Sequence, residues 1–526
     1  MDFISDLDAP LLRLSARDHF TLRDAVTGVH AFGGIGSGKS SGLAKTLSSA
    51  YLRAGMGGIV MTAKPDEIGL WKEYARQNGR SSSLVVFDES KGFNFLAHAM
   101  SMHGVAGVGS VIEILMAVLD AADRASGTGG KESEAFWSQS IAQLLQYAVP
   151  LLHAAHGTVS VSSLISFVTT AATTRGEQYF EPAFVASSFA GQTLTKAVRD
   201  PAVRLPQAEL NTLLGYWFVQ YPAIAEKTRA NIVISLTARL DRFLHGRLRD
   251  AFCGKTDIVP EMTFGGAVII LAMPALTWQA DGVVAQMTFK HALQKSVEAR
   301  NSLSEDQRQR PIFIFCDEAH YFASAYDDTF LSTCRSSRAC MVWLSQNLPS
   351  YYARLGKEKT DAVDGMIGKF SHQVFFASMC NRTNQMASQM IGKGIQWRAN
   401  QSSSQGSNQS RGMNEGSGSN AGVSSGGGAS WAGGAGPSTW NHSSNNNSTT
   451  GSSENQGVNV GRGTNESRTV GGSEAMDLIV EPNVFSTQLK TGGPMNDHKT
   501  TAIWVRSGGT FKDGFTPNAL RVTFRQ

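Results

Sequence analysis

A glycine-rich segment near the start of the chain restricts the possible folds more than any other feature of the sequence. Residues 33–40 read Gly-Gly-Ile-Gly-Ser-Gly-Lys-Ser and fit the pattern G-x-x-x-x-G-K-[ST]. An apolar run at Val26–Phe32 precedes them, and a run with helical spacing at Ser41–Arg53 follows. A glycine-rich loop between a strand and a helix is typical of a site that holds nucleotide phosphates. Further strands are predicted at Ile59–Thr62 and Leu84–Phe87 with a helix between them, which indicates an α/β domain with a mainly parallel sheet.

The residues of this loop suit phosphate binding. Glycines let backbone N–H groups turn inward around the phosphates, and the following helix offers the positive end of its dipole. Lys39 would place a point charge on the β- and γ-phosphates, and the Ser40 hydroxyl would ligate Mg²⁺. We therefore expect ATP and Mg²⁺ as cofactors. The residues expected to bind the nucleotide are Gly33, Gly34, Ile35, Gly36, Ser37, Gly38, Lys39, Ser40 and Ser41.

Two later apolar runs end in polar residues that would complete a hydrolytic site. The first, Ile312–Phe315, is followed after one cysteine by Asp317 and Glu318. In open α/β sheets, ligands bind at the carboxyl ends of the strands. We expect Asp317 to hold Mg²⁺ through water and Glu318 to act as general base on the attacking water. The second run, Met341–Leu344, is followed by Ser345 and Gln346, and the amide of Gln346 would sense the γ-phosphate. Solvated turns after both strands are the alternative.

Two arginines, Arg335 and Arg338, stand shortly before the second of these strands. An arginine at this place would be able to reach the phosphates of a neighbouring subunit and stabilise the charge of the transition state. The simpler interpretation is a basic, solvated helix end. The residues alone leave both interpretations open.

The chain changes character several times along its length. Residues 1–104 and 262–397 show the α/β pattern, whereas 105–261 show helical periodicity almost throughout and predict an inserted all-α domain. Residues 398–475 are rich in Ser, Gly and Asn, a composition that predicts a disordered linker or, alternatively, a self-associating segment. Residues 476–526 regain strand patterns and should return to the core. The predicted helices of the insertion are Ile112–Ala122, Ala135–Ala155, Ser162–Thr170, Ala208–Phe218 and Thr228–Phe252.

Composition narrows the functional class only slightly. A net charge of +4 and a pI of about 8.7 are compatible with nucleic-acid binding but do not require it. The five cysteines form no CxxC pair and no zinc-like cluster with histidine, which indicates free thiols in a reducing compartment. No run of about 20 apolar residues is present, so we expect a cytoplasmic protein that reaches the inner membrane only through partners.

Four arginines lie along one predicted helix and form either a solvated face or a weak DNA contact: Arg239, Arg242, Arg247 and Arg249.

The ordered series of these motifs resembles the type IV secretion coupling proteins, the conjugative branch of the FtsK/HerA translocase superfamily. The resemblance spans nearly the whole chain. After the phosphate loop come Thr62–Glu67, then Asp88 with Asn94-Phe95-Leu96, where Phe95 replaces a family proline. Glu134-Ala135-Phe136-Trp137 opens the helical insertion, and Lys227-Thr228-Arg229 begins its last long helix.

This resemblance implies a RecA-like motor domain with an all-helical domain, assembled as a hexameric ring that hydrolyses ATP and translocates DNA. It places an arginine finger at Arg335, with Arg338 as the alternate. It implies DNA, a relaxase and secretion-channel proteins as partners. Many coupling proteins begin with two membrane-spanning helices, and this sequence shows none. Two other functions remain open: a related translocase for DNA segregation or processing, and a nucleotide-switched receptor for secreted cargo.

Overall fold

The computed structural model describes residues 3–526 except 104–106, 126–133, 175, 201, 202, 204, 414–420, 433–438 and 451–457. The contacts within the chain divide it into two units. The first comprises Met1–Asn384 with Phe485–Gln526, and the second comprises Gln385–Val484. Residues Phe485–Gln526 therefore belong to the same unit as the phosphate loop, whereas residues 476–484 of the predicted C-terminal segment belong to the second unit.

A nine-stranded sheet forms the centre of the described part of the first unit, in the order β15-β14-β9-β3-β8-β7-β4-β6-β5. The seven strands from β9 to β5 are parallel, and β14 and β15 add an antiparallel hairpin at one edge. The predicted mainly parallel α/β sheet is thus confirmed. The strands are β3 (Val29–Phe32), β4 (Gly57–Met61), β5 (Leu84–Phe87), β6 (Val268–Leu271), β7 (Ile312–Cys316), β8 (Ala339–Ser345), β9 (His372–Phe375), β14 (Lys499–Arg506) and β15 (Ala519–Arg525). A separate hairpin joins β1 (Pro10–Arg13) and β2 (His19–Thr21).

The central strands are largely apolar because helices cover the sheet. All residues of β3, β4, β6, β7, β8 and β9 are buried. The helices of this α/β part are α1 (Leu22–Ala25), α2 (Lys45–Arg53), α3 (Asp66–Gln77), α14 (Ala275–Glu298), α15 (Glu305–Gln309), α16 (Ala325–Thr333), α17 (Pro349–Leu355), α18 (Thr360–Gly368), α19 (Asn381–Ile391) and α20 (Val484–Thr487).

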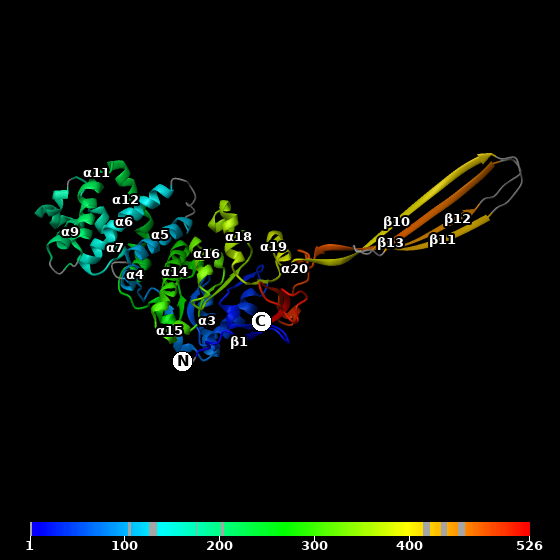
Figure 1. The fold of residues 1–526 in the computed structure, drawn as a ribbon, viewed down its shortest axis with the longest axis horizontal. Coiled ribbons are helices and arrows are strands. Elements are labelled where there is room, and N and C mark those ends of the chain that lie inside the picture. The colour runs from blue at the N-terminus through cyan, green and yellow to red at the C-terminus, as the bar shows by residue number, and fades with distance from the viewer. Residues whose placement is uncertain are drawn as a thin grey trace. The chain divides into compact units, whose positions relative to one another are not determined.

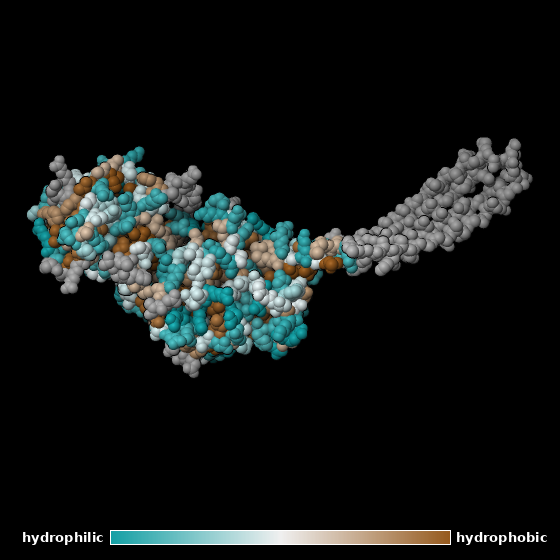
Figure 2. Space-filling model, in the orientation of Figure 1, coloured by the Kyte–Doolittle hydropathy of each residue, from teal (hydrophilic) through white to brown (hydrophobic). Residues whose placement is uncertain are grey.

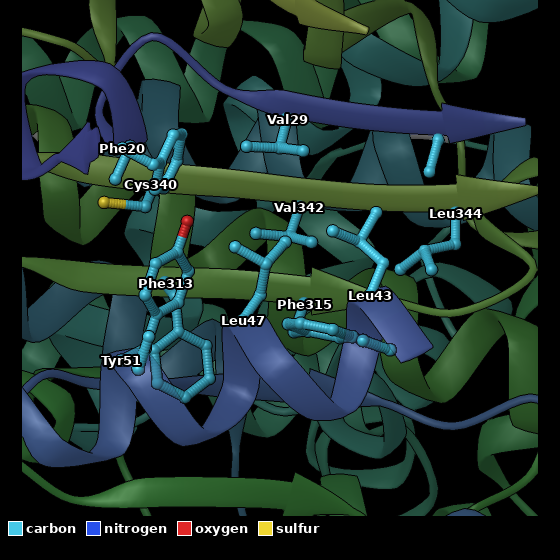
Figure 3. Packing of buried hydrophobic residues seen from close by; sticks show 14 of the residues in the cluster. Phe20, Val29, Leu43, Leu47, Tyr51, Phe313, Phe315, Cys340, Val342 and Leu344 are labelled. Atoms are coloured by element: carbon cyan, nitrogen blue, oxygen red, sulfur yellow. The ribbon is translucent and has the colours of Figure 1, made fainter. Parts of the chain in front are cut away.

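The helix after the phosphate loop is held to the sheet by one apolar stripe. It begins with a π-helical turn at Lys39–Ala44 and continues as α2. Leu43, Leu47 and Tyr51, spaced four residues apart, point from this helix toward strand residues such as Phe313 and Val342 (Figure 3). Full burial of a leucine contributes about 1.5–3 kcal/mol, so this stripe fixes the helix, and with it the loop, against the strands.

The predicted helical insertion is present between β5 and β6. Figure 1 shows α5, α6, α7, α9, α11 and α12 lying together as a group, and α5 packs on α14. The helices are α4 (Phe95–His103), α5 (Val108–Ala125), α6 (Glu134–His156), α7 (Val161–Thr169), α8 (Pro182–Ser187), α9 (Phe189–Arg199), α10 (Gln207–Gly215), α11 (Tyr221–Ala223), α12 (Glu226–Leu240) and α13 (Gly246–Phe252).

One predicted helix of the insertion is divided in the structure. The periodicity at Thr228–Phe252 predicted a single helix, but α12 ends at Leu240 and α13 begins at Gly246. Gly246 has φ +56°, a left-handed conformation that glycine adopts without the penalty of a Cβ atom. The apolar spacing continues across this break, which explains why the sequence pattern did not reveal it.

The second unit contains the Ser/Gly/Asn-rich tract, for which a disordered linker or a self-associating segment stays a prediction. The described parts of residues 398–475 lie in four antiparallel strands, ordered β10-β13-β12-β11. The strands are β10 (Lys393–Met413), β11 (Ala421–Ala432), β12 (Thr439–Thr450) and β13 (Val458–Leu478). Strand pairing uses backbone N–H and C=O groups, which Ser, Gly and Asn provide as well as apolar residues do. Residues 414–420, 433–438 and 451–457 of the predicted linker lie outside the described residues.

The helical group has some exposed apolar side chains. Phe136, Val198, Val219 and Ile234 are exposed there, and Figure 2 shows hydrophobic residues on its surface among polar ones. Within the described residues, no individual helix has the length and apolarity needed to cross a bilayer. Residues Phe136–His156 and Val161–Thr169 reach that hydropathy together, and the chain bends by 113° between them.

Candidate nucleotide-binding site

The predicted site residues meet at the carboxyl edge of the sheet. The loop after β3 carries residues 33–40, the turn after β7 carries Asp317 and Glu318, and Gln346 follows β8 directly. In the sheet, β8 lies between β3 and β7, so these three segments are neighbours although they are far apart in the sequence. This is the edge at which α/β sheets bind ligands.

The phosphate loop is anchored by β9 and β14, two strands that lie on the same side of β3. The backbone N–H of Gly34 donates to the carbonyl oxygen of Ala377 at 2.8 Å, beyond the end of β9. Farther along the loop, the Thr500 hydroxyl of β14 donates to the Ser37 carbonyl oxygen at 2.7 Å. Gly38 has φ +90°, and a Cβ atom there would lie 2.6 Å from Thr500 Oγ1. The position therefore requires glycine for its conformation and for the close approach of β14.

Lys39 has the properties expected of a phosphate ligand. Its side chain is 6% exposed, yet no acidic group within the described residues forms an ion pair with it. The hydroxyl of Ser37 is also buried without a hydrogen-bond partner there. A buried cation and a buried donor left unpaired are costly, and an anionic ligand would satisfy both.

Ser40 and Asp317 supply the oxygen pair that Mg²⁺ prefers. The Ser40 hydroxyl donates to Asp317 Oδ2 at 2.5 Å, which joins the loop to the end of β7. The other carboxylate oxygen, Oδ1, accepts the backbone N–H of Glu318 at 2.9 Å. Hydroxyl and carboxylate oxygens are suitable ligands for this hard cation, so these two residues fit a magnesium ion.

Glu318 and Gln346 contact each other beside this pair. Gln346 Nε2 donates to Glu318 Oε1 at 3.2 Å. Glu318 is buried, and its backbone φ of +51° is unusual for a residue with a side chain. The second oxygen, Oε2, has no hydrogen-bond partner within the described residues. A carboxylate with one unpaired oxygen at a phosphate site can accept a proton from water.

Two further titratable residues lie at this edge. Glu67, after β4, is buried; its Oε2 accepts the Ala63 N–H at 2.8 Å. Burial, together with the nearby charge of Asp317, raises the pKa of Glu67 to about 8. Burial, with Arg354 and Lys39 nearby, lowers the pKa of His320 to about 4, so this imidazole is neutral near pH 7.

Neither Glu67 nor His320 had a predicted role. His320 could have been identified from the sequence by its position two residues after Glu318. Glu67 was named only as the last residue of the segment that resembles the family. Its burial depends on the order of the strands in the sheet, which the sequence pattern does not contain.

Arg335 lies at the opposite edge of the sheet. It falls between the end of α16 at Thr333 and the start of β8 at Ala339, and its side chain is exposed. Since β8 has seven residues, this places it roughly 20 Å from the carboxyl edge. Arg335 cannot reach the site of its own chain, and a role at a neighbouring subunit stays a prediction. Arg338 donates to the carbonyl oxygens of Ser5 at 2.6 Å and Gln309 at 3.1 Å, so its guanidinium is engaged within the chain.

The four arginines proposed as a weak DNA contact are engaged in ion pairs. Arg239 pairs with Asp123 at 2.8 Å, and Arg242 pairs with Asp281 at 3.0 Å. The remaining pairs are Arg247 with Glu89 and Arg249 with Asp250. This arrangement favours the interpretation of a charged, partly solvated surface.

Comparisons with known proteins agree with this geometry. Residues 311–425 match the family described as the TraM recognition site of TraD and TraG. The fold is similar to the plasmid coupling protein TrwB in complex with a non-hydrolysable ATP analogue, ADPNP, with a TM-score of 0.51 and 13% identity, covering 99% of this chain and 89% of that one. The unbound bacterial conjugative coupling protein TrwBdeltaN70 gives a TM-score of 0.50 at 13% identity, covering 95% of this chain and 84% of that one. No curated protein matches the sequence.

These findings confirm the resemblance predicted from the motifs. The chain has the fold of a conjugative coupling protein, a RecA-like α/β core with an all-helical insertion. Residues 311–425, which include Asp317, Glu318 and Gln346, carry the sequence pattern of the TraD and TraG family.

Proposed function

We propose that this chain is an ATP-hydrolysing motor that couples DNA to a conjugative secretion channel. The observation that carries the proposal is the convergence of the phosphate loop, Asp317, Glu318 and Gln346 at one sheet edge, in a chain with the fold of a conjugative coupling protein. ATP as the nucleotide is supported by TrwB, which was crystallised with an ATP analogue.

Each side chain has a separate task in this proposal. Lys39 binds the terminal phosphates and balances their charge in a setting with little water. Ser40 and Asp317 would hold Mg²⁺, which supplies further charge neutralisation when bound. Glu318 accepts the proton of the attacking water, and Gln346 orients Glu318 through their hydrogen bond. Hydrolysis would weaken the contact between the γ-phosphate and Gln346 and so report the state of the nucleotide.

DNA is the proposed cargo, and assembly is proposed as a homo-hexamer in which Arg335 serves the site of a neighbouring subunit. The exposure of Arg335 at the edge opposite its own site supports this arrangement. The match to a TraM recognition site supports a second partner, a DNA-bound protein of the conjugation machinery. Contact with the inner membrane would come through such partners, which we expect to include a relaxase and channel proteins.

The proposal is tested by steady-state ATP hydrolysis of the full chain with single-stranded, double-stranded and no DNA. We expect DNA to stimulate hydrolysis. Glu318→Gln should lower kcat by about 10²–10⁴-fold, the contribution typical of a general base, without loss of nucleotide binding. Lys39→Ala should abolish binding. Size measurement on the same samples follows ring assembly.

Matched controls come from exposed residues of the same types. Lys72→Ala and Glu226→Gln change exposed side chains and should leave kcat and nucleotide affinity unchanged. The proposal is wrong if assembled protein hydrolyses ATP at the same rate with and without either DNA. It is also wrong if Glu318→Gln keeps the wild-type kcat.

A further inference from the structure

A chain of buried polar side chains runs from Glu318 to the strand that leads into the phosphate loop. His320 Nδ1 lies 3.6 Å from the unpaired Oε2 of Glu318 and 3.1 Å from the hydroxyl of Ser345. The Ser345 side chain also interacts with Tyr351, where it acts to lower a tyrosine pKa that burial raises well above its usual value. The Tyr351 hydroxyl lies 2.8 Å from Nε2 of His30 on β3.

The members of this chain come from four separate segments of the same sheet edge. Ser345 is the last residue of β8 and directly precedes Gln346, while His320 lies in the turn after β7. Tyr351 belongs to α17, and His30 lies three residues before Gly33. The chain therefore connects the segments that carry the general base, the γ-phosphate sensor and the phosphate loop.

Burial makes this arrangement informative. Ser345, Tyr351 and His30 have no solvent exposure, and His320 is 9% exposed. Buried polar groups usually form hydrogen bonds, because a buried group without a partner destabilises the fold by about 1–3 kcal/mol. The two ends are the exceptions: Glu318 Oε2 and His30 Nδ1 have no partner within the described residues.

The hydrogen atoms can be assigned in one consistent direction. With a proton on Nδ1, His320 donates to Ser345, the Ser345 hydroxyl is free to turn toward Tyr351, and Tyr351 donates to Nε2 of His30. The Nδ1–H of His320 then also points toward Glu318 Oε2. Its partial positive charge can attract that oxygen and so orient the carboxylate. Gln346 holds the other carboxylate oxygen, so both oxygens of Glu318 have a neighbour that can orient them.

We propose that His320 is a positioning residue for Glu318, and that Ser345 and Tyr351 link its orientation to the phosphate-loop strand. The inference rests on the proposed hydrolytic function and adds a residue to its machinery. Loss of the imidazole should leave nucleotide binding intact, because His320 is not among the residues that face the phosphates in this proposal. It should slow the chemical step, because the carboxylate loses one of its two orienting neighbours.

The test compares His320→Ala with His320→Asn in the full chain. The asparagine amide can place an N–H donor close to the position of Nδ1, whereas alanine removes it. We expect His320→Ala to lower kcat by about 10- to 100-fold, the effect typical of lost orienting contacts, with the Kd for a fluorescent ATP analogue within about twofold of wild type. His320→Asn should recover most of the lost kcat. Tyr351→Phe keeps the ring packing and should give a smaller fall in kcat, which tests the link if His320→Ala does not fold.

A double variant separates positioning from structural support. In the Glu318→Gln background, His320→Ala should cause no further loss, because the group it positions is already gone. The inference is overturned if His320→Ala keeps the wild-type kcat, if His320→Asn is no better than alanine, or if nucleotide affinity falls together with kcat. Full activity of Glu318→Gln would instead overturn the proposed function, and the positioning role with it.

Discussion

Lys290 and Asp327 form an ion pair with almost no solvent contact, so replacing one partner should destabilise the protein far more than replacing both. Lys290 on α14 is 1% exposed and Asp327 on α16 is fully buried, with Nζ 2.6 Å from Oδ2. Lys290 also donates to the Phe322 carbonyl oxygen at 2.7 Å, just beyond the turn that carries Glu318. Lys290→Met would leave a buried carboxylate without its cation.

The contacts of Asp327 set the size of the effect. Breaking a buried pair by removing one partner costs about 3–5 kcal/mol. Asp327 keeps hydrogen bonds from Gln294 at 2.7 Å and from the Ser324 backbone at 2.7 Å, so we expect about 3 kcal/mol. At about 2 °C per kcal/mol for a large domain, the Tm should fall by about 6 °C. Adding Asp327→Asn removes the buried charge and keeps an acceptor, so the double variant should recover part of this loss.

Thermal unfolding followed by calorimetry measures both values. Lys295→Met is the matched control, because Lys295 lies on the same helix and pairs with Glu113 at 2.5 Å but is 28% exposed. Partly exposed pairs contribute about 0–1 kcal/mol, so this variant should change the Tm by no more than about 2 °C. The reasoning is refuted if Lys290→Met and Lys295→Met destabilise equally, or if the double variant is less stable than Lys290→Met alone.

Three further variants test other parts of the structure. Gln346→Ala should lower kcat by at least about tenfold with unchanged nucleotide Kd, and a parallel fall in affinity would contradict its proposed role of orienting Glu318. Gly38→Ala should weaken nucleotide binding, measured by equilibrium titration, because its Cβ would meet Thr500 and strain the +90° φ; wild-type affinity would contradict this loop geometry. The pKa of Asp24 is about 2, because burial, which raises it, is outweighed by the hydrogen bond to His372 and other contacts. This lowered pKa stabilises the fold above pH 3.8, and the contribution is lost as the pH falls toward 2. Asp24→Asn should therefore destabilise at pH 7 and lose its difference from wild type in acid; a Tm difference independent of pH between 7 and 2 would count against it.

The local pattern of the sequence was sufficient to predict most helices and strands of the fold and part of the candidate site. Apolar runs between turns predicted β4, β7 and β8, since a strand buried on both faces must be largely apolar. The phosphate loop was recognisable because its glycines, Lys39 and Ser40 stand at short, fixed spacing.

The tertiary structure alone decided which of these residues meet. Ser40 and Asp317 are 277 residues apart and hydrogen bond because β3, β8 and β7 are adjacent in the sheet. The same strand order buries Glu67, brings His320 to Ser345, and sets Arg335 at the far edge from its own site. Local spacing determines whether a segment is a helix or a strand. Strand order depends on the packing of the whole core, and no local pattern encodes it.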